Sequence, residues 1–257
     1  MKKILFASAT ALTVTIAGGA SAADLPLKAE PVVARFSWTG CYLGGAVGGA
    51  FARKDMTDPV QLVQDSFNGA PVTQGITTVG VSPNGALVAG QIGCDYQFAN
   101  NAVIGIEGMA AGLSNKSSTA FVLPLGVPGD FASAQATTDF LTSITGRLGY
   151  AFDHVLLYGR GGVAMAGDKY EVIGSFTGIP FNFTGLENRI GWVGGAGVEW
   201  AFSPHWSVNV EYDYYGMGTK TVTMFDAGNV LLGAMDVKQN IQVVKVGLNF
   251  HAWGLGW

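Results

Sequence analysis

Apolar and polar residues alternate with a period of two along most of the chain after residue 37. In the segment 138–152, the odd-numbered positions include Asp139 and Arg147, whereas the even-numbered positions include Phe140 and Leu148. A period of two places successive side chains on opposite faces of a β-strand. The pattern therefore predicts strands with one large apolar face and one small or polar face.

Eight segments have this strand character. Their residue ranges are 38–51, 86–98, 102–114, 138–152, 155–170, 189–202, 206–221 and 239–250. Short connections rich in turn-forming residues lie at 100–101, 153–154 and 203–205, and long polar or glycine-rich connections lie at 52–85, 115–137, 171–188 and 222–238. Short turns on one side and long loops on the other are typical of an outer-membrane barrel. The sequence predicts an all-β fold, an eight-stranded antiparallel up-and-down transmembrane β-barrel.

The two faces of each segment indicate the environment of the barrel. Charged residues such as Arg147 and Glu199 share a face with small residues, and the opposite face carries the bulky apolar ones. A charge facing lipid costs about 2–4 kcal/mol near the midplane, so the small and charged face is predicted to line the interior. Aromatic residues gather at the strand ends, where membrane interfaces favour them. At the short-turn end they are Phe98, Tyr150, Phe152, Trp200, Phe202, Trp206 and Phe250, and near the long loops they are Phe51, Phe140, Trp192 and Tyr214.

The N-terminal segment has the three parts of a secretory signal. Two lysines precede an apolar run, and small residues follow up to Ala23. The run is shorter than the roughly 20 apolar residues that span a bilayer. We expect a signal peptide over 1–23, with cleavage after Ala22 or after Ala23. A periplasmic linker is expected over 24–37, the barrel over 38–250, and a C-terminal extension over 251–257.

Composition agrees with a membrane barrel. Hydrophobic residues make up 49% of the chain and charged residues 12%, about half the usual charged share. Removing Lys2 and Lys3 changes the formal net charge from −4 to −6. No basic stripe is present, so nucleic acid is not expected as a partner.

Charged residues recur on the predicted inward faces. They are Asp95, Glu107, Arg147, Arg160, Glu199, Glu211, Asp213 and Lys245, together with the polar Gln91. Eight strands enclose an interior just wide enough for side chains to fill, and buried charges need partners. We expect an interior charge network that closes the lumen. The alternative is a selectivity filter or a proton path.

The only two cysteines are predicted to form a disulfide. Cys41 lies near the short-turn end of the first segment, and Cys94 lies near the same end of the second. Opposed residues on paired strands approach within about 4.5–5.5 Å, which a disulfide can bridge. The periplasm is oxidising, so a close pair is expected to be linked.

Catalytic and metal sites are not expected. The three histidines, His154, His205 and His251, all fall near the predicted short-turn rim. None lies near a serine and an acid at the surface-loop end, and His and Cys do not cluster at ligand spacing. We therefore expect no enzyme activity, no cofactor and no metal.

Three stretches resemble a known family, the small alphaproteobacterial outer-membrane barrels. The stretch 146–152 (GRLGYAF) followed by 155–158 (VLLY) and 161–164 (GGVA) is similar to one hairpin of that family. The stretch 195–202 (GAGVEWAF) resembles a second hairpin, and 38–45 (WTGCYLGG) resembles its opening strand. The resemblance spans the whole mature chain. It implies an eight-stranded barrel of the OmpA-like kind, exposed at the cell surface and often called a porin.

The end of the chain departs from this pattern. Val244, Val246, Leu248 and Phe250 resemble the last strand that the barrel assembly machinery reads, but seven more residues follow. These residues form either a periplasmic extension or a longer last strand.

The expected role is structural: a barrel that supports the cell envelope and presents loops outside. The alternatives are a narrow porin passing small solutes or ions, and an adhesin acting through its loops. Expected partners are outer-membrane lipids and lipopolysaccharide, the barrel assembly machinery during insertion, and a host or surface ligand bound by the long loops.

Overall fold

A computed structural model describes residues 36–59, 78–121 and 129–252. Nine strands lie in these ranges. They are Gly40–Thr57 (β1), Thr78–Val81 (β2), Asn84–Gln97 (β3), Ala102–Phe121 (β4), Phe131–Phe152 (β5), Val155–Phe176 (β6), Ile179–Ser203 (β7), Trp206–Phe225 (β8) and Leu231–His251 (β9). No helix in the described part of the chain has the length and apolar character needed to cross a bilayer.

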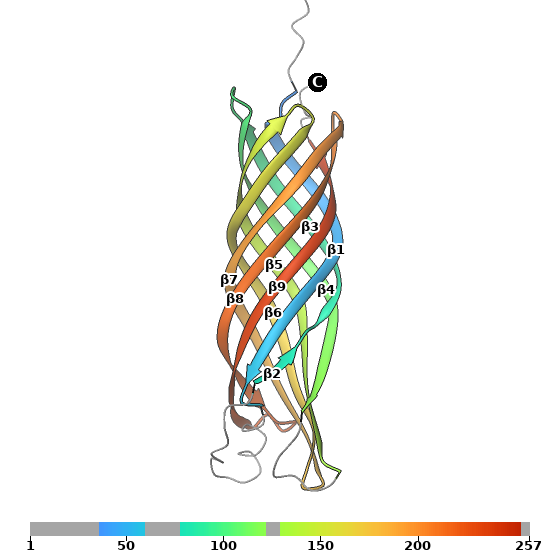
Figure 1. Cartoon of the computed structure of the whole chain (residues 1–257), viewed down its shortest axis with the longest axis vertical. Helices are drawn as coiled ribbons and strands as arrows, with labels where there is room; N and C mark the ends of the chain where they lie inside the picture. The colour runs from blue at the N-terminus through green and yellow to red at the C-terminus, as the bar shows by residue number, and fades with distance from the viewer. Residues whose placement is uncertain (1–35, 60–77, 122–128, 253–257) are drawn as a thin grey trace, which may run out of the picture. The chain divides into compact units, whose positions relative to one another are not determined.

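The strands close into an antiparallel barrel with eight positions around its ring (Figure 1). Each strand from β3 to β8 pairs with the next, and β1 pairs with both β3 and β9. The short β2 pairs with the end of β1 and continues the line of β3. Pro83 lies between them and has no backbone N–H to donate, although its carbonyl accepts from Ala52 at 3.1 Å. The predicted eight-stranded up-and-down barrel is confirmed, with one of its strands broken in two.

The strands are longer than predicted at the long-loop end. The predicted loop 171–188 is wrong, because β6 and β7 run through it and only Thr177 and Gly178 turn between them. β8 and β9 likewise occupy most of the predicted loop 222–238. Figure 1 shows the β5–β6–β7 part of the wall reaching furthest at this end. The barrel wall therefore continues well past the aromatic residues that end its apolar band.

The short turns are confirmed. Tight connections join β3 to β4, β5 to β6 and β7 to β8. Asn101 and Asp153 adopt left-handed backbone angles, with φ of 66° and 55°. Asn and Asp tolerate this conformation because their short side chains can hydrogen-bond locally.

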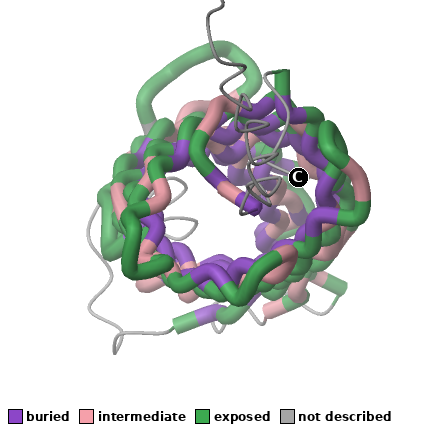
Figure 2. The backbone as a smooth tube through the Cα atoms, turned by 90° about the horizontal axis from the view of Figure 1, so that it is seen from above, coloured by how far each residue is buried: buried purple, intermediate pink, exposed green. Residues whose placement is uncertain are grey.

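Burial follows the predicted inside-out pattern (Figure 2). The exposed large apolar side chains lie on the outer face, and they include the predicted aromatics of the short-turn end. The prediction was wrong for one residue that it placed inside the barrel. A register shift between Thr138 and Phe140 leaves Asp139 exposed, whereas the alternation placed it inside. A β-bulge adds one residue to one strand and so reverses the faces on one side of it.

The described chain begins and ends at the short-turn mouth. β9 runs one residue past Phe250, and the Ala252 amide donates to the Cys41 carbonyl at 3.4 Å. The expected signal peptide, residues 24–35 of the linker, and 253–257 lie outside the described residues.

Candidate functional site

All eight predicted interior charges lie inside the barrel and form one cluster, here called the main charge layer. Its members are Tyr42 (β1), Asp95 (β3), Glu107 (β4), Arg147 (β5), Tyr158 and Arg160 (β6), Glu199 (β7), Glu211 and Asp213 (β8), and Lys245 (β9). Every position around the ring contributes at least one side chain. The layer is therefore a plate across the lumen and not a patch on one wall.

Arg147 is one of two arginines at the centre of this plate. Its Nη2 donates to Glu199 Oε2 at 2.7 Å, and its Nη1 lies 3.3 Å from Asp95 Oδ2 and 3.6 Å from Glu107 Oε2. Its guanidinium carbon also lies 4.0 Å from the centre of the Tyr158 ring. One cation thus neutralises carboxylates from three different strands.

Arg160 and Lys245 hold the other half of the plate. Arg160 Nη1 lies 2.7 Å from Glu107 Oε1 and also pairs with Glu211. Lys245 pairs with Glu211 and lies 3.6 Å from Asp213 Oδ2. Five carboxylates therefore share three cations, and removing one cation leaves several carboxylates without a neutralising partner.

Hydrogen bonds extend the plate toward the short-turn end. Glu199 Oε1 accepts from Ser207 Oγ and from Asn249 Nδ2, the latter at 2.8 Å. Ser207 Oγ also lies 2.9 Å from His251 Nε2. A catalytic triad has its carboxylate oriented toward the other nitrogen of the histidine. Here Glu199 holds the serine instead, and His251 Nδ1 has no hydrogen-bond partner within the described part of the chain.

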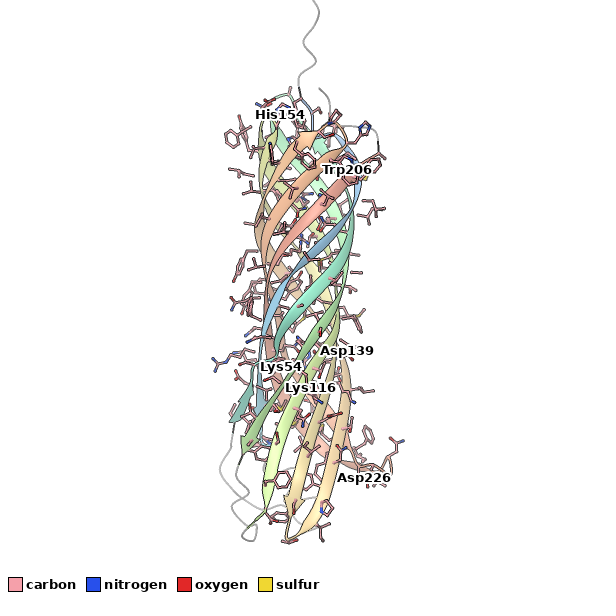
Figure 3. The ribbon with its side chains drawn as sticks, turned by 90° about the vertical axis from the view of Figure 1, so that its right-hand side faces the viewer. Lys54, Lys116, Asp139, His154, Trp206 and Asp226 are labelled. Atoms are coloured by element: carbon pink, nitrogen blue, oxygen red, sulfur yellow. A yellow bond between two sulfur atoms is a disulfide. The ribbon has the colours of Figure 1, made fainter. Side chains whose placement is uncertain are left out.

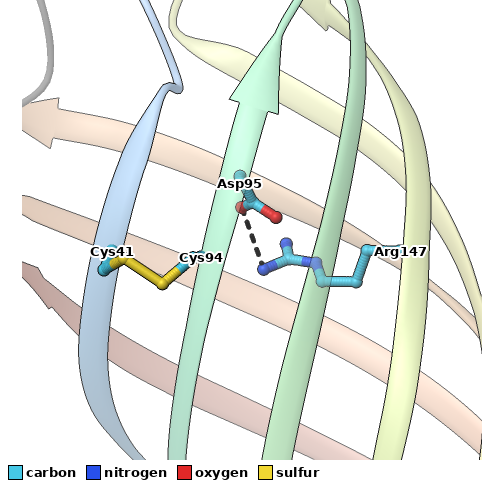
Figure 4. The surroundings of a disulfide bond; sticks show 4 residues. All are labelled: Cys41, Cys94, Asp95 and Arg147. Carbon is cyan, nitrogen blue, oxygen red and sulfur yellow. Dashed lines mark ion pairs between the residues drawn. A yellow bond between two sulfur atoms is a disulfide. The ribbon is translucent and has the colours of Figure 1, made fainter.

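The disulfide between Cys41 and Cys94 is confirmed. The two residues are directly opposed in the β1–β3 register, with Cα atoms 3.9 Å apart. Figure 4 shows the bond beside the Asp95–Arg147 ion pair, with Cys94 and Asp95 pointing to opposite faces of β3. The disulfide therefore fixes, from outside, the strand that brings Asp95 into the main charge layer.

A second charge layer, which the alternation did not predict, lies closer to the long-loop end. Asp168, on β6, pairs with two cations. Its Oδ1 lies 2.6 Å from Lys54 Nζ, and its Oδ2 lies 3.2 Å from Arg189 Nε. Thr138 and Gln239 also donate to Asp168 Oδ1, at 2.7 Å and 3.2 Å. The three charged side chains are fully buried. In Figure 3, Lys54 and Asp139 lie far along the barrel from His154 and Trp206.

Apolar side chains fill the lumen between and beyond the charge layers. The middle apolar cluster includes Leu87, Leu141, Tyr215, Met217 and Ile241. The cluster at the long-loop end includes Met56, Phe176, Phe181, Met224 and Met235. The cluster at the short-turn end includes Phe36, Trp38, Val103, Leu156 and Tyr158. The described lumen thus alternates apolar, charged, apolar, charged and apolar layers.

Trp38 closes the short-turn mouth from inside. The residue precedes β1, is only 1% exposed, and donates its indole N–H to the Asp153 carbonyl in the β5–β6 turn at 3.1 Å. The ring centre of Phe36 lies 5.3 Å from that of Trp38 and 4.4 Å from that of His154. In Figure 2 the described chain begins inside the ring. The alternation placed Trp38 at the start of the first strand, so this cross-mouth contact was not predicted.

These features match a known family. Residues 9–250 match the outer membrane protein beta-barrel domain. The chain belongs to this family. It is 29% identical over 259 residues to the 31 kDa outer-membrane immunogenic protein of Brucella melitensis. The aligned region covers 97% of this chain and 99% of that protein. It is 27% identical over 232 residues to an uncharacterized protein of Coxiella burnetii, covering 85% and 80% of the two chains.

Solved outer-membrane proteins are similar to this chain at low identity. The crystal structure of Ail, the attachment invasion locus protein of Yersinia pestis, matches with a TM-score of 0.36 and 16% identity, covering 82% of this chain and 99% of that one. The outer membrane protease OmpT from Escherichia coli matches with a TM-score of 0.48 and 9% identity, covering 84% and 98%. The family match places the protein in the outer membrane, where barrels have their short turns on the periplasmic side. No group of three or more His, Cys, Asp or Glu that could hold a metal ion occurs in the described ranges.

Proposed function

We propose that this outer-membrane barrel is a closed structural component of the envelope and does not act as an open pore. The observation that carries the proposal is the filling of the lumen by two charge layers and three apolar clusters. Ions cross a membrane barrel through a continuous water-filled path. In this barrel, side chains occupy the lumen at each of the five layers. The main charge layer also spans all eight positions of the ring, so no side of the lumen is left free of it.

Opening such a lumen requires the loss of several ion pairs at once. Moving Arg147 aside separates it from Asp95, Glu107 and Glu199 together. Breaking one buried pair costs about 3–5 kcal/mol, because an uncompensated charge stays in a low-dielectric site. The open state is therefore rare in the wild-type barrel, and its openings are narrow and brief.

Single-channel recording of the refolded barrel in planar bilayers tests this proposal. We expect low or no conductance for the wild type. Trp38→Ala combined with Arg147→Ala removes the mouth closure and one centre of the main charge layer, and we expect it to conduct. Trp206→Ala is the matched control, because Trp206 lies at the same end but on the outer face. A large, steady wild-type conductance would instead support a porin.

Recognition at the cell surface is a second candidate function. The tip of the β5–β6–β7 wall is ordered by Asp130, whose carboxylate accepts from the Thr177 amide at 2.6 Å and the Gly178 amide at 3.1 Å. Phe131 and Ile179 are exposed at this tip. An ordered apolar tip loses little conformational entropy on binding, which favours recognition.

Binding of barrel-containing vesicles to immobilised extracellular-matrix proteins tests this candidate. The variant Phe131→Ser with Ile179→Ser should lose binding while keeping the fold. Phe152→Ser, an exposed aromatic at the opposite end, serves as the control. Equal binding by both variants would remove the tip from consideration.

The remaining proposals concern partners. The alternating, aromatic-ended β9 supports recognition by the barrel assembly machinery, and the outer apolar band supports contact with outer-membrane lipids, including lipopolysaccharide. Near the periplasmic mouth, Ser207, His251 and Glu199 are buried, and the carboxylate of Glu199 accepts from the serine and not from the histidine. This arrangement differs from a catalytic triad and supports a role other than catalysis.

A further inference from the structure

The wall of the barrel is interrupted between β7 and β8. Paired residues flank the interruption, Thr184 with Phe225 on one side and Trp192 with Gly216 on the other. Between them, 185–191 of β7 and 217–224 of β8 have no ladder partner across the junction. This stretch is called the β7–β8 seam. No other pair of neighbouring strands in the described barrel has an interruption of this length.

An ion pair across the seam shows that the wall is open to solvent there. Lys220 Nζ lies 2.9 Å from Glu187 Oε1. By register, Lys220 is opposite Val237 and Glu187 is opposite Asp168, and both of these partners are buried in the lumen. The side chains of Lys220 and Glu187 are nevertheless 50% and 20% exposed. Their neighbours inside are covered, so solvent reaches the pair through the seam.

Glycines and methionines border the seam on its inner side. A Cβ at Gly185 would meet the sulfur of Met224 at 2.7 Å, and one at Gly191 would meet the sulfur of Met217 at 2.8 Å. Both methionines are buried. Thioether side chains are flexible and adapt to different apolar shapes. The seam thus has an adaptable apolar lining at each end and a cation in the middle.

The outer rim of the seam is unusually apolar for its position. Ile190 and Leu186 are 75% and 72% exposed, the highest values among the large hydrophobic residues described. They lie beyond Trp192, which contacts Tyr214 at the end of the apolar band with ring centres 5.4 Å apart. Unpaired backbone groups do not occur against lipid tails, so the seam lies at the level of the lipid headgroups.

We propose that the β7–β8 seam binds an anionic amphiphile of the outer leaflet, with its headgroup at Lys220 and its chain over Ile190 and Trp192. Lys220 has three N–H donors and uses them on Glu187 Oε1 and the Asn188 carbonyl, so one donor is free for a phosphate oxygen. The headgroup then faces outward and the chain runs toward the bilayer, as lipid orientation requires.

The carboxylates around the seam set the side on which the headgroup binds. Asp139, Glu187 and Asn188 line a pocket of about 200 Å³ on the β6 side of β7. Asp139 is exposed there and repels an anion, whereas Glu187 is already paired. The headgroup is therefore directed to the β8 side, where the free donor of Lys220 lies. Replacing Asp139 by Asn should strengthen binding.

Titration of the full barrel, refolded in dodecyl maltoside micelles, tests the proposal by NMR of the Ile190 methyl groups and the Trp192 indole. Dodecyl phosphate should give saturable shifts at both. Lys220→Gln should weaken its binding at least tenfold, and Asp139→Asn should tighten it two- to threefold. Lys116→Gln is the matched control, an exposed lysine on β4, a strand that does not border the seam, and should change affinity less than twofold.

Four results would overturn the proposal. These are equal shifts with added dodecyl maltoside, an equal loss in Lys116→Gln, saturation by inorganic phosphate at the same concentration as dodecyl phosphate, and no shift with dodecyl phosphate at all. Ile190→Asn leaves the Lys220–Glu187 pair intact and keeps the test valid if Lys220→Gln does not fold. This variant should lose its preference for dodecyl phosphate over inorganic phosphate.

Discussion

The two charge layers solve the same problem with opposite balances of charge. The main charge layer holds five carboxylates, on Asp95, Glu107, Glu199, Glu211 and Asp213, against three cations. The second charge layer holds one carboxylate, on Asp168, against Lys54 and Arg189. The residue whose loss does most harm is therefore a cation in the first and an anion in the second. In each layer the scarcer charge joins strands that are not neighbours, and this makes the layer a support across the lumen.

The largest effect is expected from Arg147→Ala. Asp95 and Glu199 lose their main cation and Glu107 loses one of two, so the free energy of unfolding should fall by about 3–5 kcal/mol. Urea unfolding of the barrel in lipid vesicles measures this. Arg147→Lys keeps the charge but not the fork of donors and should recover only part of the loss. A loss below about 1 kcal/mol would contradict the central role of Arg147.

Asp168→Asn should come next, with a loss of about 2–3 kcal/mol, at the lower end of the range for a broken buried pair. The change leaves Lys54 and Arg189 facing each other without a carboxylate. An Asn side chain still offers an oxygen to the Thr138 and Gln239 donors, which lowers the cost relative to the main charge layer. Adding Lys54→Met should restore much of the stability in the same unfolding experiment. A double variant less stable than Asp168→Asn alone would show that Lys54 acts mainly through packing.

Removing the disulfide should have a smaller effect that depends on the layer. Replacing Cys41 and Cys94 together by Ser should cost about 2 kcal/mol. Because Cys94 is next to Asp95, this loss should be non-additive with Arg147→Ala and additive with Asp168→Asn. Double-mutant cycles from urea unfolding measure both couplings. Equal couplings would mean that the disulfide acts on the whole barrel and not on one layer.

The smallest effect is expected for an ion pair outside both layers. Lys169 lies 2.7 Å from Glu171 on the exposed face of β6, and Lys169→Ala should cost less than about 0.5 kcal/mol. The hydrogen bond from Lys169 to Glu171 raises the pKa of Lys169. The small stabilisation from the Lys169–Glu171 pair is therefore present at neutral pH. It is lost when the pH is raised through the pKa of Lys169. Unfolding at neutral and strongly alkaline pH compares the two conditions, and a large loss at neutral pH would contradict the contrast with the buried layers.

The main charge layer could be predicted from the sequence because it lies within the apolar band. There, bulky outward residues such as Ile144 and Leu148 contrast with inward ones such as Arg147, so both faces of each strand are recognisable. The positions of Cys41 and Cys94 near the short-turn ends of neighbouring segments likewise predicted their pairing. The tyrosines Tyr42 and Tyr158 share the inward positions of this layer, and the alternation could have included them.

The second charge layer escaped prediction because the outward contrast ends beyond the aromatic residues. On β6 the outward positions become Lys169 and Glu171, so the strand no longer differs from a polar loop. Lys54 was assigned to a loop for this reason, although Asp168 and Arg189 keep the inward parity of their strands. The prediction for Asp139 was wrong because a bulge lies at this residue, and the seam depends on an interruption of the hydrogen-bond ladder between β7 and β8. Neither feature has a period that the sequence reveals.

The disulfide also bears on how the protein meets proteases outside the cell. Cys41 and Cys94 lie on the periplasmic half of β1 and β3, while the chain between them passes through the extracellular end. A protease that cuts once anywhere between the two cysteines opens the chain but releases no fragment, because the bond keeps both pieces covalently joined. Since β1 also pairs with β9, the nicked barrel keeps its closing strand. A single cut at the extracellular end of β1 or of β3 therefore leaves the wall in the membrane whole.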